Sequence, residues 1–299
     1  MAEVQEVRNV AQELRGNMES PWRLVWKRFK KNKLALIGLV ILTIIALCSI
    51  FAPFLTKHDP YKTNILDSRS APNSKYWLGT DSVGRDIYTR LLYGGRISLT
   101  VGLVSMSISV LIGTILGSIA GYYGGWIDNL ICRLVDIFNC FPTLILAPTV
   151  MVVFGPSIYN VMIVIGLLSW QGTCRLVRGE FLSLREREFV EAARALGEKD
   201  FRIIFKHILP NAFAPIIVSS TLKVAYAILL EASLSFLGIG VQPPIPSWGN
   251  MLTEAKNIVI LEDMPWFWIP PGIMVILSVL SINFIGDGLR DALDPKLKE

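Results

Sequence analysis

Six stretches of the chain are almost free of charged side chains, and this feature constrains the fold more than any other. The first two, residues 34–55 and 97–120, contain no Asp, Glu, Lys or Arg. A bilayer core about 30 Å thick is spanned by about 20 apolar residues of helix. The sequence therefore predicts an all-α integral membrane protein with six transmembrane helices, at residues 34–55, 97–120, 134–154, 158–174, 212–236 and 266–285.

The composition excludes several other classes of protein. Hydrophobic residues make up 52% of the chain and charged residues only 18%, whereas soluble domains carry about 25% charged residues. Such a chain is neither disordered, nor a disulfide-rich secreted module, nor a nucleic-acid-binding domain. Its four cysteines form no CxxC pair and have no histidine at a metal-ligand spacing, so no metal site is predicted.

The positions of the lysine and arginine residues predict the orientation of the chain in the membrane. With the N-terminus inside, 20 of the 29 fall in cytoplasmic segments, which agrees with the positive-inside rule. Both termini are therefore expected in the cytoplasm, in a multi-pass protein of the cell (inner) membrane. The polar residues before residue 34 are too many for a cleaved signal peptide, so the first stretch is expected to be a membrane anchor.

The expected organisation of the chain follows from these stretches. It comprises a cytoplasmic tail (1–33), the anchor (34–55), an extracytoplasmic segment (56–96), a transmembrane core (97–290) that includes a cytoplasmic loop (175–211), and a cytoplasmic tail (291–299). The extracytoplasmic segment carries seven basic residues, which the positive-inside rule does not predict.

The second stretch has a small residue at every fourth position: Ser105, Ser109, Gly113, Gly117 and Gly121. In lipid, small residues at this spacing let two helix backbones approach closely. One interpretation is tight helix packing within the chain. The other is a subunit interface, or a surface that slides during a conformational change.

Two charged residues, Lys223 and Glu231, lie within the fifth stretch. A charged side chain is costly in lipid, so both are expected to face protein or water. They are about 80° apart around a helix with 3.6 residues per turn, which disfavours a pair within that helix. In one interpretation they line a translocation path. In the other, each pairs with a neighbouring helix or subunit.

The loop between the fourth and fifth stretches is rich in helix formers. Residues 188–196 are expected to form a helix that ends at Gly197, since glycine readily occupies the position after a helix. Asp200 is expected to cap a second helix, which ends at Pro210. The apolar residues of that second helix are expected on one face: Phe201, Ile204, Phe205 and Ile208. An exposed apolar face of this kind predicts a partner.

A set of residues in this loop resembles the EAA loop of ABC-transporter permeases of the binding-protein-dependent importers: Glu191, Ala192, Ala193, Gly197, Leu209 and Pro210. In that family the loop forms a coupling helix that docks into a groove of the ATP-hydrolysing subunit. The resemblance implies the same ATPase-coupling role here. The family has an aliphatic residue two positions before the Leu-Pro pair, where this chain has His207. Both a contact with the ATPase and a packing or capping role are open for this histidine.

Four further segments resemble the dipeptide, oligopeptide and nickel permeases of that family, and in particular the "C" member of the permease pair. They are residues 78–99, 121–128, 231–252 and 286–295. The resemblance implies the type I ABC importer permease fold, with an extra N-terminal helix before a five-helix core. It also implies a function: the chain forms half of the translocation pathway for di- or oligopeptides. A nickel or oligosaccharide permease of the same family is the alternative.

The resemblance also implies the partners. These are a homologous second permease subunit in a heterodimer, two ATP-binding subunits, an extracytoplasmic substrate-binding protein and the lipid bilayer, with no nucleic acid. The chain has no GxxxxGK[ST] phosphate loop, so it is not expected to be an enzyme or to hold a cofactor, and ATP-Mg is used by the partner subunits. A secondary transporter is disfavoured, because Glu231 is almost the only acidic residue in the stretches and no inverted repeat is evident.

Overall fold

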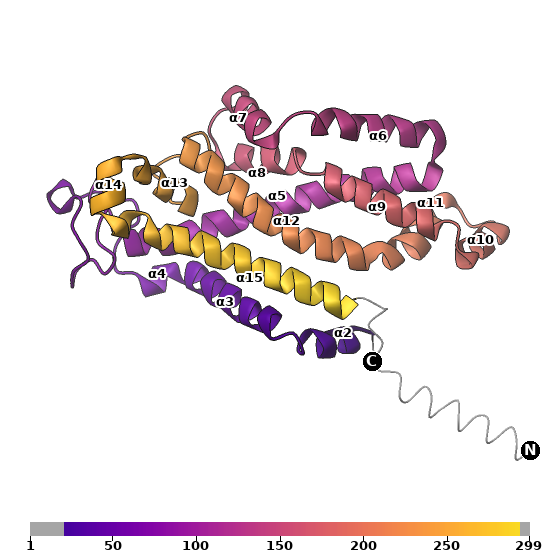
Figure 1. Cartoon of the computed structure of the whole chain (residues 1–299), viewed down its shortest axis with the longest axis horizontal. Coiled ribbons are helices and arrows are strands. Elements are labelled where there is room, and N and C mark those ends of the chain that lie inside the picture. Colours follow the sequence, from indigo (N-terminus) through magenta and orange to yellow (C-terminus); the bar gives the residue numbers. More distant parts are fainter. Residues whose placement is uncertain (1–20, 294–299) are drawn as a thin grey trace, which may run out of the picture.

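The computed structural model describes residues 21–293, and within that range the chain is helical, with no β-strand and one isolated bridge between Thr80 and Asp86. Four long helices lie along the molecule (Figure 1): α3 (Lys33–Ile50), α5 (Ile87–Tyr123), α12 (Leu209–Leu237) and α15 (Ile269–Leu293). Among residues 21–293, five helices are long and apolar enough to cross a membrane, or six if a bent pair of helices forms one span. The predicted all-α membrane fold is confirmed. The predicted tails, 1–33 and 291–299, lie partly outside the described residues.

Side chains at the helix ends explain where several helices begin. The Asn32 side chain accepts the Ala35 backbone N–H at 3.1 Å before α3, and Asp86 accepts the Thr89 N–H at 3.0 Å before α5. Each bond satisfies a backbone donor that has no partner within its helix. Helix α5 begins ten residues before the predicted stretch at residue 97, because Asp86 caps it there.

The N-terminal helix of the membrane region packs on the C-terminal helix. A Cβ atom added at Gly38 of α3 would lie 2.7 Å from the Ser281 carbonyl oxygen of α15. The short helix α2 (Pro21–Phe29) packs beside the end of α15, where Phe29, Ala35 and Ala292 form a small buried cluster. The anchor is thus part of the bundle rather than a separate element.

The third predicted stretch, residues 134–154, is not one straight helix. It is divided between α6 (Gly125–Asn139) and α7 (Thr143–Phe154), which meet at an angle of 88°. Pro142 precedes α7 at the break. Proline disfavours helical conformation in the residue before it and lacks a backbone N–H, so the helix ends there.

The fourth predicted stretch continues further than expected. Helix α8 (Ile158–Leu167) is followed after a three-residue break by α9 (Gln171–Leu184), so the predicted loop 175–211 begins only at Arg185. The charged residues Arg175 and Arg178 of α9 pair with Asp136 and Asp128 of α6; the first pair is exposed and the second is partly buried.

The prediction that Pro210 ends a helix is wrong. The short α11 (Asp200–Arg202), a π-helical turn over Ile203–Ile208 and α12 form one continuous helix from Asp200 to Leu237. A π-helical turn bonds residue i to i+5 and widens the helix. Since proline clashes with the carbonyl four residues earlier, this widening just before Pro210 lets the helix continue through it.

Helix α5 lies directly against α9. A Cβ atom added at Gly113 or Gly121 would lie 2.5 Å from the Cβ of Thr173 or Phe181, and one at Gly117 would lie 2.6 Å from the Cys174 carbonyl oxygen. The three glycines thus lie inside the chain, where a larger residue would push the two helices apart.

Candidate coupling site

Helix α10 (Glu188–Ala195) and α11 lie at one end of the molecule, and α13 (Trp248–Leu252) and α14 (Ile258–Asp263) lie at the opposite end (Figure 1). Helix α10 rests on a buried apolar cluster. The buried members of this inner cluster come from α5, α9, α10 and the helix that starts at Asp200: Tyr122, Val177, Phe181, Val190, Ala193, Ile203, Ile204, Ile208, Ala212 and Ile216.

The end of α10 is fixed by two backbone hydrogen bonds around Gly197. The Gly197 N–H donates to the Arg194 carbonyl at 2.9 Å, and the Glu198 N–H donates to the Ala193 carbonyl at 3.1 Å. These bonds form a Schellman motif, in which the residue after the cap is left-handed. Gly197 has φ +76°, a conformation that glycine adopts without steric cost.

The residues that resemble the EAA loop have different surroundings. Ala193 is buried in the inner cluster, Leu209 packs against it, and Glu191, Ala192 and Pro210 are exposed. Within the part of the chain that the structure describes, no hydrogen bond or ion pair is found for the Glu191 side chain. The loop thus has one face held by the bundle and one face, with Glu191, that is free for another molecule.

The expected apolar face of the second helix is divided. Ile204 and Ile208 are buried, whereas Phe201 is 72% exposed and Phe205 is 50% exposed. The rings of Phe201 and Phe205 lie 4.4 Å apart, and Leu196 is 84% exposed. We call Leu196, Phe201 and Phe205 the apolar patch. Nothing in the described chain covers it.

The prediction that Asp200 caps the second helix is also wrong. Lys199 is the N-cap residue, and the Asp200 carboxylate instead accepts the Tyr122 hydroxyl at 2.7 Å. The Arg194 guanidinium lies 5.4 Å from the centre of the Tyr122 ring, and Arg185 donates to the Gly121 carbonyl at 3.1 Å. The loop is therefore tied to the end of α5. Sequence reasoning missed this link, although Gly121 and Tyr122 lie in one of the matched segments.

His207 contacts a residue of its own loop. Its Nε2 atom lies 2.7 Å from Oε2 of Glu198, and Arg202 lies 3.3 Å from the other oxygen of that carboxylate. Glu198 directly follows Gly197, so these contacts join the turn after α10 to the π-helical turn. Of the two roles left open for His207, packing within the loop has this geometric support.

Lys223 and Glu231 are not brought together. Glu231 is fully buried, and its carboxylate accepts the Ser98 hydroxyl at 3.1 Å and the Ser235 hydroxyl at 2.7 Å. Ser98 in turn accepts the Trp248 backbone N–H at 3.2 Å. The Lys223 ammonium, half-buried, donates to the Ser169 carbonyl at 2.6 Å, at the break between α8 and α9. Ser98 and Ser235 lie in two of the segments that resemble the permease family, but nothing in the sequence pairs them with Glu231.

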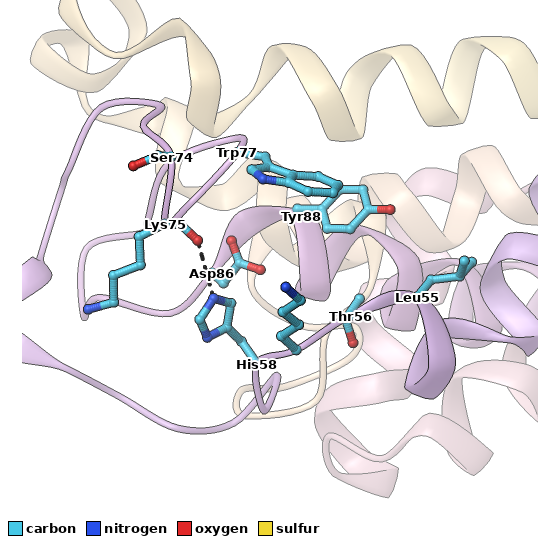
Figure 2. A pocket seen from close by; sticks show the side chains of 9 residues that line it. Leu55, Thr56, His58, Ser74, Lys75, Trp77, Asp86 and Tyr88 are labelled. Atoms are coloured by element: carbon cyan, nitrogen blue, oxygen red, sulfur yellow. Dashed lines mark hydrogen bonds between the residues drawn. The ribbon is translucent and has the colours of Figure 1, made fainter.

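The far end of the bundle from α10 carries the cavities. A small pocket of about 100 Å³ is lined by Leu55, Trp77, Asp86 and Tyr88, and His58 Nε2 lies 3.3 Å from the Lys75 carbonyl at its rim (Figure 2). A larger cleft of about 470 Å³ lies between residues 69–90 and 235–260. Among residues 21–293 no group of three or more His, Cys, Asp or Glu side chains could hold a metal ion.

Two known protein families match this sequence, and a solved transporter structure has a similar fold. The family described as "Binding-protein-dependent transport system inner membrane component" matches residues 113–299, and the "N-terminal TM domain of oligopeptide transport permease C" matches residues 20–72. The inward-facing MetNI methionine ABC transporter has a similar fold, with a TM-score of 0.55 at 19% identity over 69% of this chain and 97% of that one.

Two curated relatives match nearly the whole length. The dipeptide transport system permease protein DppC of Alkalihalophilus pseudofirmus is 50% identical over 93% of this chain and 91% of its own. The glutathione transport system permease protein GsiD of Salmonella typhimurium is 44% identical over 94% of this chain and 92% of its own.

Proposed function

The chain belongs to the family of binding-protein-dependent transport system inner membrane components, and on this premise we propose that it forms half of a pathway through which peptides cross the membrane. The peptide substrate is supported by the 50% identity to a dipeptide permease and the 44% identity to a glutathione permease, since glutathione is itself a small peptide. The other half of the pathway is a homologous permease.

The observation that carries the coupling role is an exposed apolar patch on a rigidly held loop. Helix α10 is anchored by Val190 and Ala193 in the inner cluster, while Leu196, Phe201 and Phe205 remain exposed. A soluble partner is expected to cover such a patch. We assign this partner as an ATP-binding subunit, into whose groove the loop docks. Glu191, exposed on α10, is available to a basic or hydrogen-bonding group of that subunit.

The loop is connected so that a movement of the ATPase would reach the membrane helices. The inner cluster and the Tyr122–Asp200 bond join the loop to α5, and the continuous helix from Asp200 joins it to α12. Closure of two ATPases on ATP-Mg would thus move both helices together. The opening of the pathway would then alternate between the two sides of the membrane.

This proposed role implies an orientation in the membrane. The α10 end is cytoplasmic, and α2 and the C-terminal end of α15 lie toward it (Figure 1), in agreement with cytoplasmic termini. The residue 56–86 segment and the α13–α14 end are then extracytoplasmic, where a substrate-binding protein delivers the peptide. For Glu231, enclosed by serines in this outer half, we propose a structural role. Lys223, closer to the middle of α12, is the residue we assign to the pathway.

Reconstitution of the assembled complex tests the proposal. An affinity tag on the chain should recover a second permease and two ATP-binding subunits. The complex in proteoliposomes should take up a tripeptide such as trialanine only with ATP and the binding protein. Transport by the purified chain alone, or uptake that is independent of ATP, would overturn the proposal.

A further inference from the structure

The cleft of about 470 Å³ at the end of the bundle opposite α10 is lined by more basic than acidic side chains. Arg69, Arg85, Arg90 and Lys256 face it, against Glu254 as the one acidic residue of its lining. Its volume lies in the range of sites that hold small molecules, roughly 300–1,000 Å³. The role assigned to the chain above does not use these basic residues.

Most of the charges around the cleft are already paired. Arg85 Nε lies 2.6 Å from the Asp81 carboxylate behind the cleft wall, and Arg90 lies 3.6 Å from it. Arg90 also donates to the carbonyls of Pro60 and Pro244 at 3.1 and 3.2 Å. Glu254 accepts the Ser82 hydroxyl at 2.6 Å. These bonds make the wall rigid and leave little free charge on it.

Arg69 is different. Its guanidinium has no hydrogen bond or ion pair within residues 21–293, and its backbone has φ +55°, in the left-handed region, where no other non-glycine residue of that range lies. That conformation costs an L-residue energy and persists only where the surroundings impose it. They do so here: the Arg69 N–H donates to the Asp81 carbonyl at 3.1 Å, and the neighbouring Ser70 N–H donates to Thr80 Oγ1 at 2.9 Å. The turn thus holds an unpaired guanidinium at the cleft.

We propose that this cleft binds the C-terminal carboxylate of a peptide as it enters the pathway, with Arg69 as the group that recognises it. A guanidinium presents a planar fork of donors that matches a carboxylate. Lys256, held 5.1 Å above the ring of Phe236, adds a second positive charge at the cleft. A concave site of this size suits the end of a short chain better than the surface of a folded protein. The inference rests on the proposed function, since it assumes that peptides are the substrate.

Uptake of trialanine and of its C-terminal amide by the reconstituted complex tests the proposal. The two peptides are supplied at concentrations that give equal occupancy of the binding protein, so that differences arise in the membrane complex. Loss of one charge-assisted hydrogen bond corresponds to about a tenfold effect. Arg69→Gln should lower trialanine uptake about tenfold and leave uptake of the amide unchanged, while Arg69→Lys should retain most of the trialanine uptake.

Two further variants separate the guanidinium from the backbone. Arg69→Gly accepts the left-handed conformation without strain and should behave like Arg69→Gln, because both lack the guanidinium. Lys62→Gln, an exposed basic residue of the same segment outside the cleft, should transport both peptides like the unsubstituted complex. An Arg69→Gln complex with normal uptake of trialanine would overturn the inference. So would an equal loss for both peptides, which would assign Arg69 to docking of the binding protein. Absence of ATP-dependent trialanine uptake by the unsubstituted complex would instead overturn the proposed function, and this inference with it.

Discussion

Gly197 lies in open space, so its importance comes from its backbone and not from packing. No atom lies within 4 Å of a Cβ added there, but its φ of +76° is left-handed. A left-handed conformation costs an L-residue about 1–2 kcal/mol, and asparagine tolerates it better than most. The turn after α10 should therefore depend on which residues accept this conformation, whatever their size.

Substitution of Gly197 should follow conformational preference. Gly197→Asn should keep assembly and peptide uptake near normal, whereas Gly197→Leu and Gly197→Val should lower the number of peptides transported per ATP or prevent assembly. Co-purification of the ATPases and uptake in proteoliposomes measure this. A Gly197→Leu complex that assembles and transports normally would contradict this account of the turn.

The surroundings of Glu231 distinguish a structural carboxylate from one that lines a pathway. Glu231→Ala leaves the Ser98 and Ser235 hydroxyls without their acceptor, at a cost of about 1–3 kcal/mol for each unsatisfied buried group. Glu231→Gln keeps an acceptor oxygen and should cost less. We expect a lower Tm of the purified complex for Glu231→Ala than for Glu231→Gln, with exposed Glu262→Ala as the control. Lost transport in a Glu231→Gln complex of unchanged Tm would instead place the residue on the pathway.

At the scale of elements, the close contact between α5 and α9 depends on glycines, which have no side chain to hold the two helices apart. A Cβ at Gly117 would lie 2.6 Å from the Cys174 carbonyl oxygen and 2.8 Å from the Cβ of Val177, whereas one at Gly179 of α9 would meet nothing within 4 Å. Overpacking a close contact costs about 1–3 kcal/mol. Gly117→Ala should lower the Tm of the complex, and Gly179→Ala should not. Equal Tm values for the two variants would show that α5 and α9 move apart freely.

The sequence predicted elements better than their ends. Hydropathy located five spans, because the need for about 20 apolar residues leaves few alternatives, but it did not predict that the third stretch is divided between α6 and α7. It could not predict that α9 continues to Leu184, because charged residues such as Arg175 and Arg178 indicate a loop. Only the structure shows that they pair with acidic residues of α6. Nor could it predict that the helix passes Pro210, because the π-helical turn before that residue has no pattern of its own. The loop motif located the candidate site. The hydrogen bond from Tyr122 to Asp200 could not be predicted, because it joins residues 78 positions apart in the sequence.

At the scale of the whole molecule, the proposed orientation places the seven basic residues of the 56–96 segment outside the cell, against the positive-inside rule. Several of its basic residues are bound within the chain: Lys75 to Asp67, Arg85 to Asp81, and Arg96 to the carbonyls of Ser49 and Ile50. These contacts accommodate the basic side chains in the folded segment, but they do not change the count, because the rule counts Lys and Arg and is not a net-charge rule. The seven basic residues of this segment therefore remain a departure from the rule, outweighed by the larger number in the segments proposed to be cytoplasmic.

If the loop at one end of the molecule opens a pathway that is loaded at the other end, movement has to be transmitted along the helices between them. Helix α5 runs from Ile87, near the cleft that Arg90 lines, to Tyr122 and Tyr123, beside the loop. Only the hydroxyl of Tyr122 is bonded to the loop, through Asp200 at 2.7 Å; the neighbouring Tyr123 ring is half exposed. These adjacent tyrosines therefore provide a matched pair for testing whether the bond transmits movement.

Tyr122→Phe removes one hydroxyl and leaves the ring in the inner cluster, so the complex should assemble and hydrolyse ATP. A net contribution of about 1 kcal/mol is typical of such a bond. This is enough to loosen the loop from α5 without unfolding either. We expect fewer peptides transported per ATP in Tyr122→Phe and in Asp200→Ala, which removes the acceptor. We expect no further loss in the double variant, because both remove the same bond, and normal coupling in Tyr123→Phe. Additive losses in the double variant would mean that the two residues act separately. Unchanged coupling in all of the variants would mean that the Tyr122–Asp200 bond does not transmit the movement.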